Sequence, residues 1–301
     1  PRGPLGLLQT RAGSLGGGSC GANCSLPHSH ARCDTYDNAL AIIYYVKRRN
    51  FAEAKKLLDI FVRLLYPFDP TTVAPEVVYD PPSGRKMTLL ATAYSTSKKT
   101  WAGKYDGKGV AEGTVDTGNN AWAALAFAHF AAAANASCYA VVARDILHAL
   151  SRGGGCSDKL QGFLGRMPPT KNNYRSSEHN IDMLALARML GDTDIMMQAS
   201  HFVRQMYVPT GPLGPSYRMG DVSCRPAPPP GPQMPVPADA IYWGLLAGAD
   251  PDRQHVDKTL AFALGDSPRV RQPPPGALPP PPPPPPQPPP PPPVPPHHAA
   301  K

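Results

Sequence analysis

Two kinds of helical pattern alternate along the sequence. Residues 38–47 are apolar on nearly every side, whereas residues 51–66 place apolar side chains on one face and Lys and Glu on the other. The first pattern is typical of a helix buried all round, and the second of a helix that covers it. The alternation continues in three further pairs: 120–134 with 137–150, 180–190 with 194–207, and 239–249 with 251–264. We therefore expect an all-α chain with four helical hairpins.

Acidic residues and asparagines head the apolar helices. Their recurrence at intervals of about 60–80 residues indicates one supersecondary unit used repeatedly. Such a repeat would deliver several carboxylates to the same end of the inner helices. The heads are Asp37-Asn38, Asp116-Thr-Gly-Asn119-Asn120, Glu178-His179-Asn180-Ile-Asp182 and, in a weaker copy, Asp239.

Details of the pattern give further expectations. Residues 86–97 are rich in β-formers and predict either a short strand pair or an excursion over one face in the long connection after the first hairpin. Arg144, Asp145 and His148 are expected on the polar face of their helix. Pro251 fits the first turn of the last helix, where its missing N–H costs nothing.

Proline and glycine limit the part of the 301-residue chain that builds a core. Residues 1–33 are Gly/Ser-rich and predicted to be flexible, and residues 267–301 form an almost unbroken proline tail predicted to be disordered. Residues 34–266 then form one domain, in which the proline-rich stretch 226–237 is an inserted loop.

Charge and hydropathy argue against two classes of partner. The net charge is +8, but the basic residues are scattered, and the densest cluster, Lys47-Arg48-Arg49, suits the C-terminal end of a helix. We therefore expect no nucleic-acid partner. No run of eighteen apolar residues occurs, so no membrane span is expected.

The cysteines do not predict a metal. The chain has six, and Cys20, Cys24 and Cys33 enclose His28 and His30. These are zinc-ligand types, but their spacing matches no standard zinc pattern. We expect incidental thiols, no metal and no cofactor.

The heads resemble those of the six-hairpin glycosidase superfamily. The motifs that carry the likeness are 35–41 (Thr-Tyr-Asp-Asn-Ala-Leu-Ala), 115–126 (Val-Asp-Thr-Gly-Asn-Asn-Ala-Trp-Ala-Ala-Leu-Ala) and 177–182 (Ser-Glu-His-Asn-Ile-Asp). The resemblance implies an (α/α)6 toroid that binds an oligo- or polysaccharide at the N-terminal ends of the inner helices, and it favours secretion. Four hairpins would make a partial or truncated toroid.

Glycoside hydrolysis needs two carboxyl groups, one to protonate the leaving oxygen and one to activate water or attack the sugar. We expect Glu178 as the general acid and Asp116 as the base, with Asp37 and Asp182 in reserve. Capping is the competing explanation, because Asp, Ser, Thr and Asn are all favoured at helix N-termini. The aromatic residues and amides that accompany the carboxylates are not needed for capping.

Sugar sites combine aromatic faces with amides and carboxylates. Core packing is the competing explanation for the two tryptophans, which lie inside apolar helices, and a cap-region hydrogen bond is the competing one for the histidine. The expected substrate-binding residues are Tyr36, Asp37, Asn38, Asn119, Asn120, Trp122, Tyr174, His179, Asn180, Asp182, Asp239 and Trp243.

A second function remains open. A non-catalytic helical-repeat module could bind a glycan or a protein, with the proline tail as a spacer or as a ligand for proline-reading domains. A terpene-cyclase-like toroid is disfavoured because the sequence has no Asp-x-Asp-Asp motif.

Overall fold

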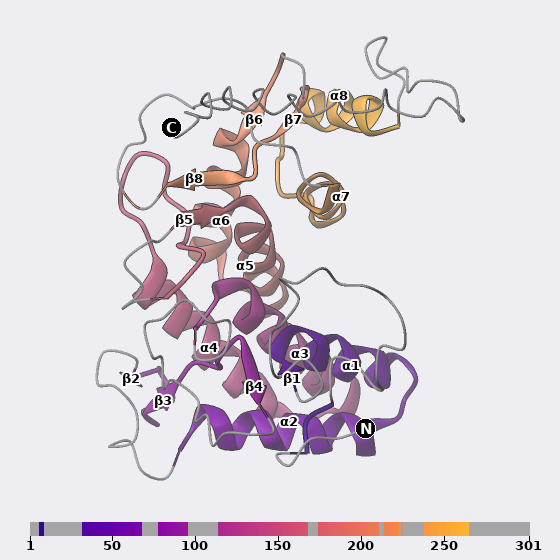
Figure 1. The fold of residues 1–301 in the computed structure, drawn as a ribbon, viewed down its shortest axis with the longest axis vertical. Helices are drawn as coiled ribbons and strands as arrows, with labels where there is room; N and C mark the ends of the chain where they lie inside the picture. The colour runs from indigo at the N-terminus through magenta and orange to yellow at the C-terminus, as the bar shows by residue number, and fades with distance from the viewer. Residues whose placement is uncertain are drawn as a thin grey trace, which may run out of the picture.

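The computed structural model describes residues 6–8, 32–67, 78–95, 114–167, 174–210, 214–222, 224 and 238–264. Within them the chain forms eight α-helices, which follow one another as four hairpins along the long axis of the molecule (Figure 1). The prediction of an all-α array of four hairpins is confirmed. The inner helices are α1 (Thr35–Lys47), α3 (Thr117–Ala134), α5 (Ser177–Leu190) and α7 (Ala238–Ala247), and the outer helices are α2 (Phe51–Leu65), α4 (Ser137–Gly154), α6 (Thr193–Gln205) and α8 (Arg253–Ala263).

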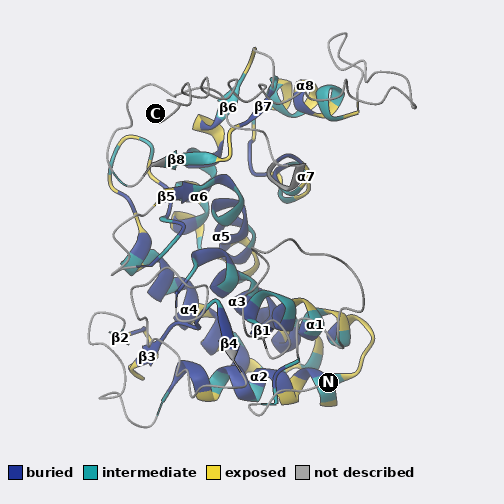
Figure 2. Ribbon diagram, in the orientation of Figure 1, coloured by how far each residue is buried: buried dark blue, intermediate teal, exposed yellow. Residues whose placement is uncertain are grey.

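Inner helices pack on one another in chain order, α1 on α3, α3 on α5 and α5 on α7. Helix α3 shows why, because its run of alanines with Leu125, Phe127 and Phe130 is buried almost all round and leaves no polar face (Figure 2). Small alanine side chains allow the backbones of neighbouring helices to approach closely. The alternation of inner and outer helices is that of an (α/α) toroid.

Outer helices have one buried face. In α2, Leu57, Leu58 and Phe61 are buried, while Lys55 and Lys56 are exposed. This amphipathic pattern places the apolar face against the inner layer.

Helix α4 departs from the predicted pattern at Asp145. This carboxylate was expected on the polar face, but it is buried, and its Oδ2 accepts hydrogen bonds from Tyr66 Oη at 2.7 Å and Ser83 Oγ at 2.6 Å. Buried carboxylates need such donors to offset their lost hydration. Asp145 therefore joins α4 to the end of α2 and to the segment that follows it.

Helices α3 and α5 end as predicted, at Ala134 and Leu190, whereas α8 starts later than predicted. Residues Asn135 and Gly191 adopt left-handed conformations after α3 and α5, and their backbone N–H groups bond the last turns. Helix α8 begins at Arg253, because Asp252 is its N-cap and accepts from Gln254 N, so Pro251 precedes the helix. The expected place of Pro251 in the first turn was wrong.

Short antiparallel ribbons connect the hairpins. The predicted strands within 86–97 are present, but they pair with other segments and not with each other. The ribbons are β1 (Arg32–Asp34) with β4 (Ala93–Ser95), β2 (Val78–Tyr79) with β3 (Met87–Thr88), β5 (Tyr174–Ser176) with β8 (Gly220–Val222), and β6 (Tyr207–Val208) with β7 (Ser216–Tyr217).

Parts of the N-terminal segment pack on the domain, although residues 1–33 were predicted to be flexible. Leu7 is fully buried, and Arg32 and Cys33 belong to strand β1. The proline segments 226–237 and 267–301 lie outside the described residues, as do Cys20, Cys24, His28 and His30. No helix in the described part of the chain has the length and apolar character needed to cross a bilayer.

Candidate functional site

The first three inner helices begin with the same amide clamp. Asn120 Nδ2 donates to Leu90 O at 2.9 Å and to Asp116 O at 3.0 Å, and its Oδ1 accepts from Leu90 N at 2.8 Å. One side chain thus satisfies both backbone groups of a loop residue and the carbonyl four positions earlier. The pattern recurs for Asn38 with Leu8 and Asp34, and for Asn180 with Phe163 and Ser176.

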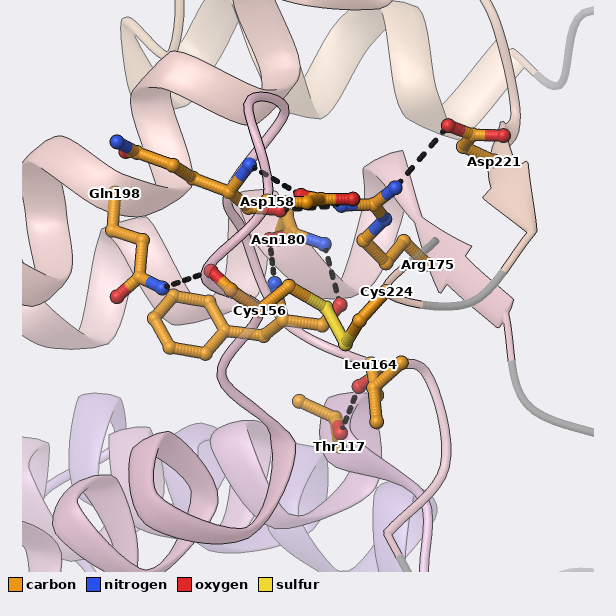
Figure 3. The surroundings of a disulfide bond; sticks show 11 residues. Thr117, Cys156, Asp158, Leu164, Arg175, Asn180, Gln198, Asp221 and Cys224 are labelled. Carbon is orange, nitrogen blue, oxygen red and sulfur yellow. Dashed lines mark hydrogen bonds and ion pairs between the residues drawn. A yellow bond between two sulfur atoms is a disulfide. The ribbon is translucent and has the colours of Figure 1, made fainter. Parts of the chain in front are cut away.

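The first residue of each of these helices carries a hydroxyl that donates a hydrogen bond to a backbone carbonyl of a loop. Thr117 Oγ1 donates to Leu164 O at 2.5 Å, and its backbone N–H donates to Gly165 O at 3.0 Å. Two loops are therefore held by the hydroxyl of one inner helix and by the asparagine of the next, as Thr117 and Asn180 illustrate for residues 163–165 (Figure 3). In the same way, the hydroxyls of Thr35 and Ser177 donate to Ala91 O and Arg218 O, and their backbone N–H groups donate to Thr92 O and Met219 O.

These clamps correct the prediction for three residues. Asn38, Asn120 and Asn180 are fully buried and their amides are engaged by the backbone, so they shape the site and do not face a substrate. The clamps also align the starts of the inner helices. We call the N-terminal ends of α1, α3 and α5, with the loop residues that these clamps and hydroxyl groups bond, the rim.

Asp116 lies at the rim directly before α3 and does not cap it. Its side chain makes no cap hydrogen bond. Instead, Arg166 Nε donates to its Oδ1 at 3.0 Å, and Thr92 Oγ1 donates to its Oδ2 at 2.9 Å. Both carboxylate oxygens therefore have donors of the kind that an ionised carboxylate prefers.

His179 lies in the first turn of α5, and its ring faces α3. Its Nδ1 lies 3.1 Å from Gly165 O, and because a carbonyl only accepts, Nδ1 carries the proton and Nε2 is the acceptor nitrogen of the neutral ring. Burial lowers the pKa of His179, and Arg166 lowers it further, while the charge of Asp116 and the hydrogen bond to Gly165 oppose the shift.

Gly118 makes room for this histidine. A Cβ at that position would lie 2.5 Å from His179 Cδ2 and 3.2 Å from Asp182 Oδ2, so only glycine permits the contact. The same distances place Asp182, which is buried, beside His179 at the interface between α3 and α5. Asp182 therefore lies deeper than a residue at the mouth of a site.

Tyr174 lies beside His179, just before α5. Its ring centroid lies 6.1 Å from that of His179, and more than a third of the residue is exposed. Burial raises the pKa of Tyr174, the negative charges of Asp116 and Glu178 raise it further, and Arg166 lowers it.

Three inner helices contribute an aromatic row. The Tyr36 and Trp122 rings meet edge to face at 5.4 Å between centroids, and Trp122 and Trp243 do so at 5.8 Å. All three are half-buried, and the two tryptophans also pack against the core. Buried Trp122 Nε1 has no hydrogen-bond partner among the described residues.

Other predicted residues are not joined to this cluster by a described contact. Asp37 and Asn119 are half-buried at the starts of α1 and α3. The side chain of Asp239 lies outside what the structure describes.

Two surface hollows lie elsewhere, and no predicted site residue lines either. One, of about 490 Å³, is lined by Ser151, Gly155, Cys156, Ser157, Gln161, Asp194, Met197 and Gln198. The other, of about 290 Å³, is lined by Tyr66, Pro67, Val78, Arg85, Lys86, Met87 and Thr88. In the described part of the chain, no three His, Cys, Asp or Glu side chains are grouped to hold a metal ion.

Sequence reasoning missed Arg166 and Thr92, the partners of Asp116, and the contact that needs Gly118. No local signal marks Arg166 or Thr92, because their loops meet Asp116 only in the fold. The clamps did leave a signal, namely a hydroxyl residue three positions before an asparagine, in Thr35/Asn38, Thr117/Asn120 and Ser177/Asn180.

Searches of protein-family models and of curated proteins find no match to the chain. Three solved structures are similar in fold. A GH76 α-mannanase from Bacteroides thetaiotaomicron is 10% identical with a TM-score of 0.48, over 77% of this chain and 60% of that one. An α-amylase from Clostridium perfringens is 12% identical with a TM-score of 0.44, over 62% of this chain and 46% of that one.

The third is a family 105 glycoside hydrolase from C. acetobutylicum, which is 13% identical with a TM-score of 0.40, over 58% of this chain and 48% of that one. This chain thus spans about half to three-fifths of the length of these structures.

Proposed function

We propose that this chain acts on carbohydrate and hydrolyses a glycosidic bond at the rim. The observation that supports this most concerns Asp116, which makes no cap hydrogen bond to α3 and is instead held by Arg166 and Thr92 at the start of that helix. Glu178 lies in the first turn of the neighbouring inner helix α5. Glycoside hydrolysis requires two carboxyl groups, one on each side of the scissile bond.

The surroundings of the two carboxylates suggest different roles. Asp116 receives donors on both oxygens, from Arg166 and Thr92, which suits a group that stays ionised and acts as the base. Glu178 is half-buried in the first turn of α5 and is assigned the role of general acid. In this reaction the C–O bond of the glycoside breaks and Glu178 donates its proton to the leaving oxygen, while Asp116 accepts a proton from the water molecule whose oxygen bonds the sugar carbon.

The aromatic row supports a carbohydrate as the ligand. Aromatic faces pack against the C–H faces of pyranose rings, and Tyr36, Trp122 and Trp243 bring three such rings together at the starts of the inner helices. Their partial exposure leaves some ring surface for such contacts.

The test is the release of reducing ends from a panel of oligo- and polysaccharides by the wild type, Glu178→Gln and Asp116→Asn. Loss of the acid or of the base should lower turnover by about 10²–10⁴-fold, the usual contribution of general acid–base catalysis. Asp194→Asn is the matched control, because Asp194 is an exposed carboxylate in the first turn of the outer helix α6.

Equal turnover by the wild type and both variants would exclude these assignments. Glycan binding without turnover by the wild type would instead favour a non-catalytic binding module, and neither binding nor turnover on any glycan would refute the proposal.

A further inference from the structure

One buried arginine, in the strand directly before α5, joins three segments that are distant in sequence. Arg175 lies in β5 and is fully buried. Its Nη1 bonds Asp158 Oδ1 at 2.7 Å and Gln161 O at 2.9 Å, and its Nη2 lies 3.3 Å from Asp221 Oδ2 (Figure 3). The guanidinium therefore connects the loop that follows α4 with strand β8.

A disulfide connects the same two segments. Cys156 lies at the start of that loop, and Cys224 lies two residues after β8, 68 positions away in sequence (Figure 3). The covalent bond and the ion pairs of Arg175 thus act in parallel. We call residues 155–167 the brace loop.

Backbone hydrogen bonds within the brace loop join its first residues to the residues near its far end. Cys156 N donates to Gly162 O at 2.9 Å, and Gly155 forms an antiparallel bridge with Phe163. These bonds fix the loop into a narrow hairpin. A displacement at Cys156 must therefore shift Phe163 and the residues that follow it.

The far end of the brace loop touches the proposed catalytic cluster. Gly165 O accepts from His179 Nδ1, and Arg166 pairs with Asp116 through its side chain and through a backbone bridge. Met167 N also donates to Val115 O at 2.9 Å, next to Asp116. The positions of His179 and Asp116 therefore depend on the brace loop.

We propose that the Cys156–Cys224 disulfide and Arg175 are positioning elements of the rim, which hold the brace loop so that Arg166 and Gly165 orient Asp116 and His179. The catalytic part of this inference rests on the proposed function. The positioning part is measurable without any substrate.

The first test is reduction of the folded wild-type chain with a water-soluble phosphine. The phosphine takes oxygen from one water molecule and becomes the phosphine oxide, while the disulfide takes up two electrons and two protons to give two thiols. Hydrogen exchange at the Leu164 and Met167 amides should then become about tenfold faster or more, because local opening requires fewer broken contacts.

The second readout is the NMR titration of the His179 ring. In the oxidised chain burial lowers its pKa, and after reduction the pKa should rise towards the ordinary value, because a looser loop admits water. His129 in α3 is the internal control, because it titrates beside Lys47 and makes no described contact with the brace loop.

Variants test the disulfide and the ion pairs of Arg175 separately. Cys156→Ser combined with Cys224→Ser should reproduce the effects of the phosphine, and Arg175→Lys, which keeps one charge but loses the fork, should add to them. Cys138→Ser is the matched control, because Cys138 is an exposed free thiol on α4. If a sugar substrate is turned over, kcat should fall more than KM rises, since the aromatic row is untouched.

Unchanged amide exchange and an unchanged His179 titration after reduction would overturn the inference, whatever the activity. If reduction speeds amide exchange but the chain turns over no glycan, the positioning role of the disulfide and Arg175 stands and the proposed function is rejected. If Arg175→Lys fails to fold, the reduction experiment on the wild type still decides the matter.

Discussion

At the scale of single residues, one asparagine and one hydroxyl side chain perform the same task at three helix starts. Asn120 is an example, because its side chain satisfies the buried N–H and C=O of Leu90. Polar backbone groups that are buried without partners are expensive. Conservative changes at these positions should therefore act on stability rather than on sugar contacts.

Replacing Asn120 with Ala should destabilise the fold by about 1–3 kcal/mol or more, because it leaves the buried backbone groups of Leu90 without partners. Chemical denaturation of the variant measures the loss. Asn119→Ala is the matched control, since Asn119 is half-buried beside Asn120 and no hydrogen bond is described for its side chain. Equal stability of the two variants would contradict the clamp.

His179 gives the fold a predictable response to acid. Burial lowers its pKa below the usual value of 6.5, so between that value and the folded-state pKa the unfolded chain binds more protons. The free energy of unfolding should therefore fall as the pH drops from above 6.5 through the folded-state pKa, and then level off.

The measurement is denaturation across this pH range for the wild type and His179→Asn, which keeps an amide donor near the place of Nδ1. The variant should lose the part of the pH dependence that His179 contributes. Identical curves for the two proteins would show that His179 is not buried in its neutral form.

At the scale of elements, the contact between α3 and α5 brings the candidate site together. Gly118→Ala should force His179 and Asp182 away, because the new Cβ would lie 2.5 Å from the imidazole. We expect a loss of about 1–3 kcal/mol, the usual cost of overpacking. Gly244→Ala in α7 is the matched control, because its Cβ would meet only Ile181 Cδ1 at 3.5 Å and alanine favours the helix.

Thermal unfolding of the two glycine variants is the readout. The melting temperature should fall for Gly118→Ala and stay constant or rise for Gly244→Ala. A similar melting temperature for both would mean that α3 and α5 can separate without cost.

The helices were predictable because their apolar periodicity is local, whereas the contacts of the rim were not. The apolar runs predicted inner helices starting at Asn38, Asn120 and Asn180, yet each starts three residues earlier, at a hydroxyl residue whose partner lies in a distant loop. The disulfide was equally hidden, because pairing across 68 residues cannot be deduced from cysteine spacing.

At the scale of the molecule, four hairpins succeed one another and three share the clamp. Helix α7 begins at Ala238 and has Ile241 where the other inner helices have asparagine, so the fourth hairpin is attached differently. Arg188 of α5 donates to Ala247 O, and Ser200 of α6 donates to Ala249 O at 2.7 Å. The weaker fourth head in the sequence thus corresponds to a different attachment in the fold.

At the proposed site Asp116, Glu178 and the aromatic row act together, and the central proposal is that glycosidic bonds are broken there. The most direct measurement compares glycosides of one sugar that carry either a dinitrophenol or an alkyl alcohol as the leaving group. Dinitrophenolate leaves without a proton, whereas an alkoxide needs one.

Glu178→Gln should therefore retain most turnover of the dinitrophenyl glycoside when departure of the leaving group limits the rate, and lose about 10²–10⁴-fold on the alkyl glycoside. Asp116→Asn should be slow on both. Equal losses by Glu178→Gln on the two substrates, or none on either, would contradict its role as the acid and with it the account of the rim.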